Sequence, residues 1–78
     1  MTRRQSEFAG LLPRLPIEEL LGITKIMGIG LVCGEDENGE KLVKDGEIII
    51  QEMFDKFSTY DKTRQKNLLR IMRAAAKK

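Results

Sequence analysis

Proline and glycine divide this chain into short segments, and that division limits what it can fold into. Pro13 and Pro16 interrupt its first part, and glycines recur in residues 28–34. Asn38 and Gly39 add a further break in the middle. Because proline lacks an amide donor and disfavours helix in the residue before it, no helix is expected to run through these points. The sequence therefore predicts several short elements that pack together, not one long helix.

Four segments between these breaks have apolar residues at helical spacing. They are residues 6–12, 16–28, 45–57 and 61–76. Pro16 suits the first position of its helix, Gly28 suits a left-handed C-cap, and Asp45 and Asp61 suit N-caps. The predicted buried faces are Phe8, Leu11 and Leu12; Ile17, Leu20, Leu21, Thr24 and Met27; Ile49, Ile50, Met53, Phe54 and Phe57; and Leu68, Leu69, Ile71, Met72 and Ala75.

Residues 31–43 lie between the second and third predicted helices and allow two interpretations. Residues 31–33 are β-prone, and Asn38-Gly39 favours a type I′ turn, after which Leu42 and Val43 pair back as a short hairpin. The other interpretation is a solvated acidic loop. The predicted fold class is mainly α: a compact bundle of about four short helices, with a short β-hairpin inserted between helices two and three under the first interpretation.

The composition restricts the chemistry available to the chain. With 78 residues, one domain over 1–78 is expected, with residues 1–5 and 77–78 outside its ordered part. The chain has one cysteine and no histidine, so it lacks the pairs that activate a serine or cysteine nucleophile and the motifs that bind zinc. We therefore predict no catalytic residue, no metal site and no cofactor, and a protein that is not an enzyme.

The same composition indicates where the protein works. The apolar run at residues 48–50 is far shorter than the roughly 20 residues that a membrane helix needs. Glu7 and Arg14 interrupt the apolar stretch that a signal peptide would require. A lone Cys33 fits a reducing compartment, and we expect its side chain to be a small buried hydrophobe. These features predict a cytoplasmic protein that does not enter the membrane.

The last predicted helix carries a row of positive charges, which we call the basic ridge. Residues 61–78 contain seven basic side chains against one acidic one. Spacings of three and four place the row along one side of the helix. The ridge could bind nucleic-acid phosphates, an acidic protein surface or an anionic membrane, or it could simply be solvated. Its residues are Lys62, Lys66, Arg70, Arg73 and Lys77.

An acidic segment lies in the middle of the chain. Residues 35–60 contain eight acidic side chains against three basic ones. A calcium loop is not predicted, because Lys41 takes the position where such a loop needs glycine. The segment could instead imitate phosphates toward a protein that binds nucleic acid, or it could be a solvated loop. Its residues are Glu35, Asp36, Glu37 and Glu40.

Gly22 gives the second helix a superficial likeness to a helix-turn-helix. Such a motif needs a small residue four positions before the glycine, where this chain has Glu18, and a branched apolar residue six positions after it, where this chain has Gly28. We therefore predict a continuous helix through Gly22, with this glycine allowing close contact between helices.

Three segments resemble small uncharacterised proteins carried on prophages and mobile elements of Firmicutes. They are residues 15–23 (LPIEELLGI), 55–57 (DKF) and 64–71 (RQKNLLRI), so the similarity covers both halves of the chain but not its acidic middle. The resemblance implies a small accessory protein encoded by a mobile element. Proteins of that kind often act by binding a larger host protein, and inhibitors of CRISPR nucleases are one such class.

Three functions follow as expectations. The first is a non-enzymatic phage or mobile-element protein that binds a host protein, specifically a CRISPR nuclease, and inhibits or modulates it. The alternative is a small regulator that binds nucleic acid through the basic ridge. The second alternative is a structural homodimer in which Ile48 and Phe8 form the contact, since a chain this short can need a second copy to complete its core.

Overall fold

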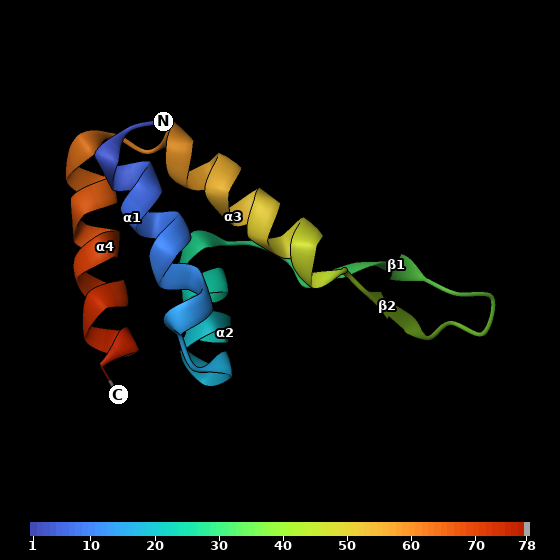
Figure 1. The fold of residues 1–78 in the computed structure, drawn as a ribbon. Coiled ribbons are helices and arrows are strands. Elements are labelled where there is room, and N and C mark those ends of the chain that lie inside the picture. Colours follow the sequence, from blue (N-terminus) through green and yellow to red (C-terminus); the bar gives the residue numbers. More distant parts are fainter. Residues whose placement is uncertain (78) are drawn as a thin grey trace.

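The computed structural model describes residues 1–77, which form helices with one hairpin between the second and third α-helices (Figure 1). The predicted fold class is confirmed, and residues 31–43 adopt the hairpin, not the open loop. The elements are α1 (Arg3–Leu11), the short 3₁₀ helix η1 (Leu12–Arg14), α2 (Ile17–Met27), β1 (Val32–Glu35), β2 (Lys41–Val43), α3 (Gly46–Thr59) and α4 (Lys62–Ala76). Lys78, which falls in a terminus predicted to lie outside the ordered domain, is outside the described residues.

Local sequence signals set most helix ends. The side chain of Asp45 accepts a hydrogen bond from the amide of Glu47, and that of Asp61 accepts one from the amide of Arg64, so both predicted N-caps are confirmed. Gly28 ends α2 with a left-handed backbone at φ 72°, as predicted. Left-handed backbone is costly for residues with a Cβ atom, which explains why glycine occupies this end.

The first helix begins earlier than its apolar spacing indicates. Thr2 and Gln5 form a capping box, in which each side chain binds the other residue's backbone amide, so α1 starts at Arg3 and not at Ser6. The second helix differs by one position: Pro16 is its N-cap and Ile17 its first residue. It runs without a break through Gly22, as predicted. The close helix contact expected at Gly22 is wrong, since a Cβ atom there would meet nothing within 4 Å.

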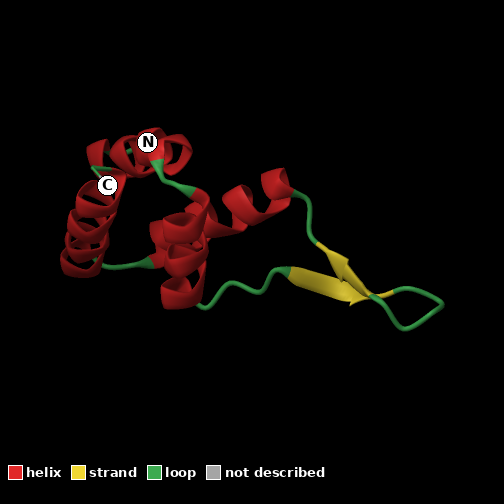
Figure 2. Cartoon of the chain, turned by 90° about the horizontal axis from the view of Figure 1, so that it is seen from below, coloured by secondary structure: helices red, strands yellow, loops and turns green. Residues whose placement is uncertain are grey.

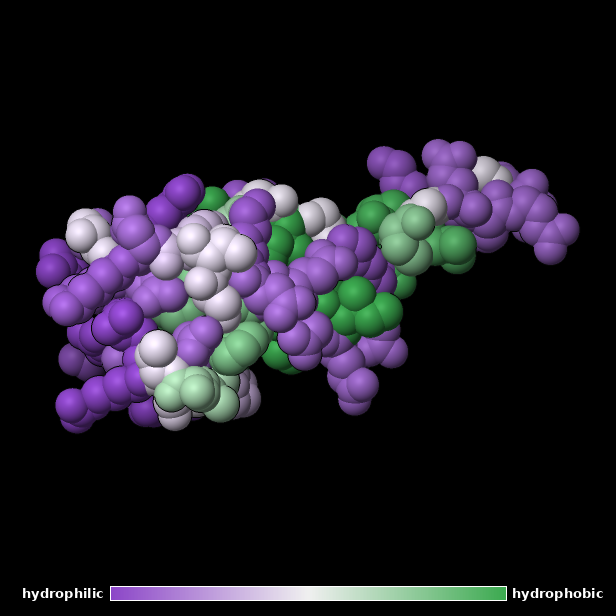
Figure 3. All heavy atoms as spheres, turned by 90° about the horizontal axis from the view of Figure 1, so that it is seen from above, coloured by the Kyte–Doolittle hydropathy of each residue, from purple (hydrophilic) through white to green (hydrophobic). Residues whose placement is uncertain are grey.

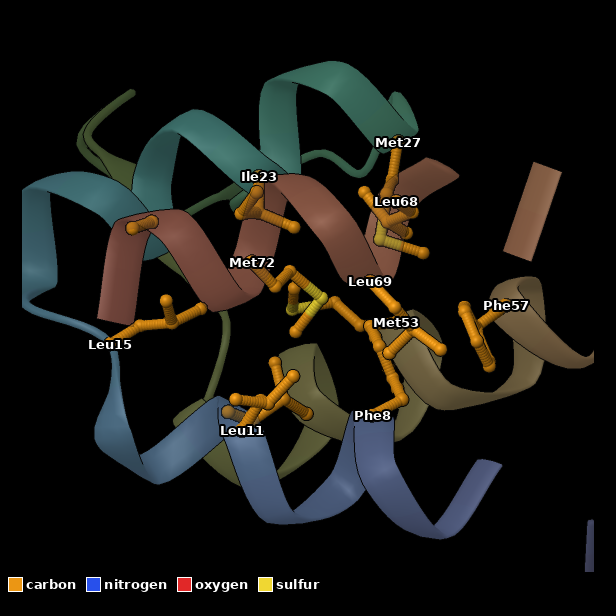
Figure 4. Close-up of a cluster of buried hydrophobic side chains, with 12 residues drawn as sticks. Phe8, Leu11, Leu15, Ile23, Met27, Met53, Phe57, Leu68, Leu69 and Met72 are labelled. Carbon is orange, nitrogen blue, oxygen red and sulfur yellow. The ribbon is translucent and has the colours of Figure 1, made fainter. Parts of the chain in front are cut away.

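A single apolar core joins the four α-helices (Figure 4). Within this core Phe8 of α1 stacks on Phe57 of α3, with ring centroids 4.3 Å apart and planes 3° apart. An aromatic pair with its rings in contact adds to the free energy gained from burial. The buried apolar residues are Phe8, Leu11, Leu12, Leu15, Ile23, Met27, Met53, Phe57, Leu68, Leu69, Met72 and Ala75.

Several residues predicted to be buried are exposed. Ile17 is 72% exposed, Ile50 and Ile71 are each 46% exposed, and Leu21 is also exposed. Helix α2 buries its C-terminal half instead, through Ile23 and residues beyond it. Apolar spacing identifies the inward side of a helix but not the length over which neighbouring helices cover it. The N-terminal parts of α2 and α3 therefore leave apolar side chains uncovered.

The hairpin projects away from the helices (Figure 2). A type I′ turn would need a positive φ at both Asn38 and Gly39. Of these two residues only Gly39 has one, of 78°, so the turn is not type I′. The amide of Gly39 donates a hydrogen bond to the carbonyl of Asp36 at 3.0 Å. This bond closes a type I turn that ends at a glycine with left-handed backbone. Cys33 lies on this hairpin and is exposed, so its predicted burial is wrong.

Candidate protein-binding arm and basic ridge

Residues 32–43, which we call the acidic arm, form the most protruding part of the molecule. All residues of both strands are exposed. The described chain measures 44 Å along its longest axis and 17 Å along its shortest. Figure 3 shows hydrophilic side chains over the outer end of the arm and apolar ones near its base. The predicted acidic segment therefore lies at the free end of a narrow projection.

The four acidic residues of the arm have different roles. The Asp36 side chain is committed to the turn, since its Oδ1 accepts hydrogen bonds from the amides of Asn38 and Glu40, both at 2.9 Å. Glu35 lies opposite Lys41 in the strand register, an arrangement of opposite charges that stabilises a hairpin. Glu37 and Glu40 are exposed, and within residues 1–77 neither side chain has a hydrogen bond or an ion pair.

The base of the arm is tied to the helical body. The Lys44 ammonium, 17% exposed, binds both carboxylate oxygens of Glu52 on α3, at 2.9 and 3.1 Å. The Lys44 amide continues the strand ladder by donating to the carbonyl of Leu31 at 2.8 Å. A charge-assisted contact of this kind, partly screened from water, restrains the direction of the arm. Sequence reasoning missed this pair because its residues belong to different elements.

The basic ridge lies along the solvent side of α4, and all of its residues are exposed. Arg73 is bound to Glu7 of α1, with Nε 2.6 Å from Oε2. This pair reduces the positive charge available at the C-terminal part of the ridge. Lys66 and Arg70, one turn apart, have no hydrogen bond or ion pair among the described residues. The central part of the ridge is therefore free to bind an anionic partner.

The arm and the ridge lie at opposite ends of the molecule. In Figure 1, α1 and α3 separate α4 from the hairpin. Charges farther apart than the Debye length, about 8 Å at physiological salt, are largely screened from one another. Neither surface therefore neutralises the other, and a partner can use one of them without the other.

The structure also contains a groove that sequence reasoning missed. It has a volume of about 660 Å³ and lies between the α1–η1–α2 segment and α3. The signal that could have found it is the surplus of apolar residues at the start of α2 and α3, which include Ile17 and Ile50. Its lining consists of Ala9, Leu12, Pro13, Leu15, Ile17, Leu20, Ile50, Gln51 and Phe54.

Of the two residues expected to form a homodimer contact, only one is on the surface. Ile48 is exposed, but the side chain of Phe8 is fully buried in the core. Phe8 is therefore unavailable to a second copy, and this part of the expectation is wrong.

Within residues 1–77, no group of three or more His, Cys, Asp or Glu side chains is arranged to hold a metal ion. No helix in the same range is long and apolar enough to cross a membrane. No protein-family model, curated protein or solved structure matches this chain.

Proposed function

We propose that this chain is a small non-enzymatic protein of a phage or mobile element that binds a host protein and inhibits or modulates it. The specific candidate for the host protein is a CRISPR nuclease in the cytoplasm. The observation that carries the proposal is the projecting acidic arm, whose Glu37 and Glu40 side chains are exposed and unpaired within the described residues. The mobile-element setting rests on the resemblance of the helical segments.

The shape and charge of the arm suit a channel built for nucleic acid. Two paired strands lie about 5 Å apart, so the arm is narrow enough to enter a groove that accommodates a strand or a duplex. CRISPR nucleases hold their guide–target duplex in a positively charged channel and recognise it mainly by shape and backbone. Carboxylates at the end of the arm would take the place of phosphates in such a channel and exclude the nucleic acid.

The proposal is tested by target cleavage with a purified, guide-loaded CRISPR nuclease. The intact chain should inhibit cleavage, and the double variant Glu37→Lys and Glu40→Lys should lose that inhibition. These two residues are chosen because Asp36 holds the turn and Glu35 opposes Lys41, so the hairpin should survive the change.

A charge change on the other end of the molecule provides the matched control. The double variant Lys66→Glu and Arg70→Glu replaces two exposed ridge residues and should inhibit as well as the intact chain. If the arm variant still inhibits, or the intact chain never does, the proposal is wrong. If only the ridge variant loses inhibition, the ridge and not the arm is the binding surface.

A regulator that binds nucleic acid through the ridge is the second candidate. It is supported by the exposed and unpaired state of Lys66 and Arg70 within residues 1–77. Anisotropy of a labelled random duplex, titrated with the chain at several salt concentrations, tests it. Binding that weakens steeply with salt, with a slope reduced by about one unit for each lost phosphate contact in Lys66→Ala and Arg70→Ala, would favour it. An absence of binding at low salt would exclude it.

A further inference from the structure

We propose that the apolar groove between α1, α2 and α3 binds an amphipathic helix of a partner protein, one whose apolar stripe is flanked by Lys or Arg. This is a second interaction surface, on a different part of the molecule from the acidic arm, and it does not depend on what the arm binds.

The lining of the groove suits apolar side chains. Its volume of about 660 Å³ lies within the range of about 300–1,000 Å³ typical of ligand-binding clefts. Gln51 is the single polar residue among its lining residues, and none of them is charged. Ile17 at 72% exposure and Ile50 at 46% face water without cover. Adjacent apolar side chains left uncovered by the fold are typical of an interaction site.

One side of the groove allows a helix to come close. It is formed by the exposed residues Ala9 and Pro13, which are one turn apart. Small residues let the backbone of an approaching helix lie near the surface, while its large side chains reach down toward Leu12 and Leu15. Residues spaced at i, i+3, i+4 and i+7 on the incoming helix would fill such a groove.

The opposite side of the groove is acidic. Glu47, Gln51 and Asp55 follow one another at spacings of four, so they form a row along one side of α3. Gln51 lines the groove and donates a hydrogen bond to Asp55 at 2.9 Å. Glu47 is exposed, and its carboxylate has no hydrogen bond or ion pair among the described residues. On α2, exposed Glu18 lies next to Ile17. The charges beside the groove are thus complementary to a basic helix.

The same acidic side chains disfavour two other occupants of an apolar groove, a second copy of this chain and a fatty acid. Two copies of this chain joined groove to groove would bring the rows from Glu47 to Asp55 toward one another, and like charges oppose association. A fatty-acid carboxylate would meet the same repulsion. A helix with Lys or Arg on both sides of its apolar stripe satisfies the apolar lining and the acidic side together.

A pair of synthetic peptides tests this inference. Each is a helix of roughly four turns, about 14 residues, with leucines at i, i+3, i+4 and i+7. One has Lys at the flanking positions, and its twin has Glu there. Both are titrated into labelled protein that carries Glu37→Lys and Glu40→Lys, so that the acidic arm cannot attract the basic peptide. Binding is followed by anisotropy, and its location by amide chemical shifts.

The Lys peptide should bind saturably, shift the amides of Ala9, Leu20 and Ile50, and bind at least tenfold more tightly than the Glu twin. Ile50→Gln should weaken binding at least tenfold, whereas Ile71→Gln should not, although both residues are 46% exposed and the substitution is the same. Glu47→Lys should abolish the preference for the Lys peptide.

Four results would overturn the inference. They are no saturable binding of either peptide, equal binding of the twins, shifts centred away from the groove, and self-association of the chain that Ile50→Gln abolishes. The last result would assign the groove to a second copy. None of these results bears on the arm, because the protein used already has the arm's charges reversed.

Discussion

At the scale of single residues, Gln65 connects three helices. It is buried in α4, its Nε2 donates to the carbonyl of Phe57 in α3 at 2.9 Å, and its Oε1 accepts from Nε of Arg4 in α1 at 2.7 Å. Sequence spacing does not predict this role, because it depends on partners from two other elements. A buried hydrogen-bonding group whose partner is removed is costly to leave unpaired.

Replacing Gln65 should therefore destabilise the fold. Gln65→Ala should lower the free energy of unfolding by about 1–3 kcal/mol, because it removes both hydrogen bonds of this side chain, the one to the Phe57 carbonyl and the one from Arg4. Gln51→Ala removes an exposed glutamine and should change it by less than about 0.5 kcal/mol. Urea denaturation followed by circular dichroism measures both. Equal effects of the two substitutions would show that Gln65 does not have this connecting role.

Two glycines, one inside α2 and one at its C-cap, should change the stability of the fold in opposite directions when replaced by alanine. Gly28→Ala should lower the free energy of unfolding by about 1–2 kcal/mol, because φ there is 72° and a Cβ atom strains left-handed backbone. Gly22→Ala should raise it by about 0.5–1 kcal/mol, because this glycine is inside the helix with open space around it. Thermal melting of both variants tests the pair, and a change of the same sign in both would contradict it.

At the scale of elements, helix ends were more predictable than helix faces. The caps at Asp45, Asp61 and Gly28 depend on backbone within a few residues, so the sequence predicts them correctly. The exposure of Ile17 and Ile50 depends on how far neighbouring helices extend, which local spacing does not encode. The apolar groove was missed for this reason.

The hairpin was predictable as an element but not in its turn. Asn38-Gly39 correctly indicated the reversal, yet the type I′ geometry was replaced by a turn that the Asp36 carboxylate stabilises. A two-stranded hairpin is marginally stable alone, so these hydrogen bonds and the Lys44–Glu52 pair are expected to order the arm.

Asp36→Ala should thus unfold the arm without unfolding the helices. Two amides would lose their acceptor, and amide exchange in β1 and β2 should become rapid. The free energy of unfolding of the helical body should change by less than about 0.5 kcal/mol, because no residue of either strand is buried in the core. Amide exchange and circular dichroism together measure both effects. Continued protection of the strands would contradict this account of the turn.

At the scale of the whole molecule, charge segregation in the sequence becomes separation in space. Both candidate surfaces were predicted as sets of residues. Glu37 and Glu40 lie in the turn between β1 and β2, the ridge lies on α4, and α1 and α3 stand between α4 and the hairpin (Figure 1). The roles of Asp36 and Arg73 were not predictable, because each is engaged by a contact that only the folded chain creates. The sequence shows how the charges are distributed along the chain. It does not show which charged side chains are left without an ion pair or a hydrogen bond once the chain folds.

The central claim is that the acidic arm occupies a nucleic-acid channel of its partner. The most direct measurement is the anisotropy of a labelled target duplex bound to a guide-loaded CRISPR nuclease, followed as the chain is added at about 0.15 M salt. The account predicts that the duplex is displaced to completion, and that Glu37→Lys with Glu40→Lys prevents displacement. A duplex that stays bound at saturating chain, or one that binds the chain directly in the absence of the nuclease, would contradict the account.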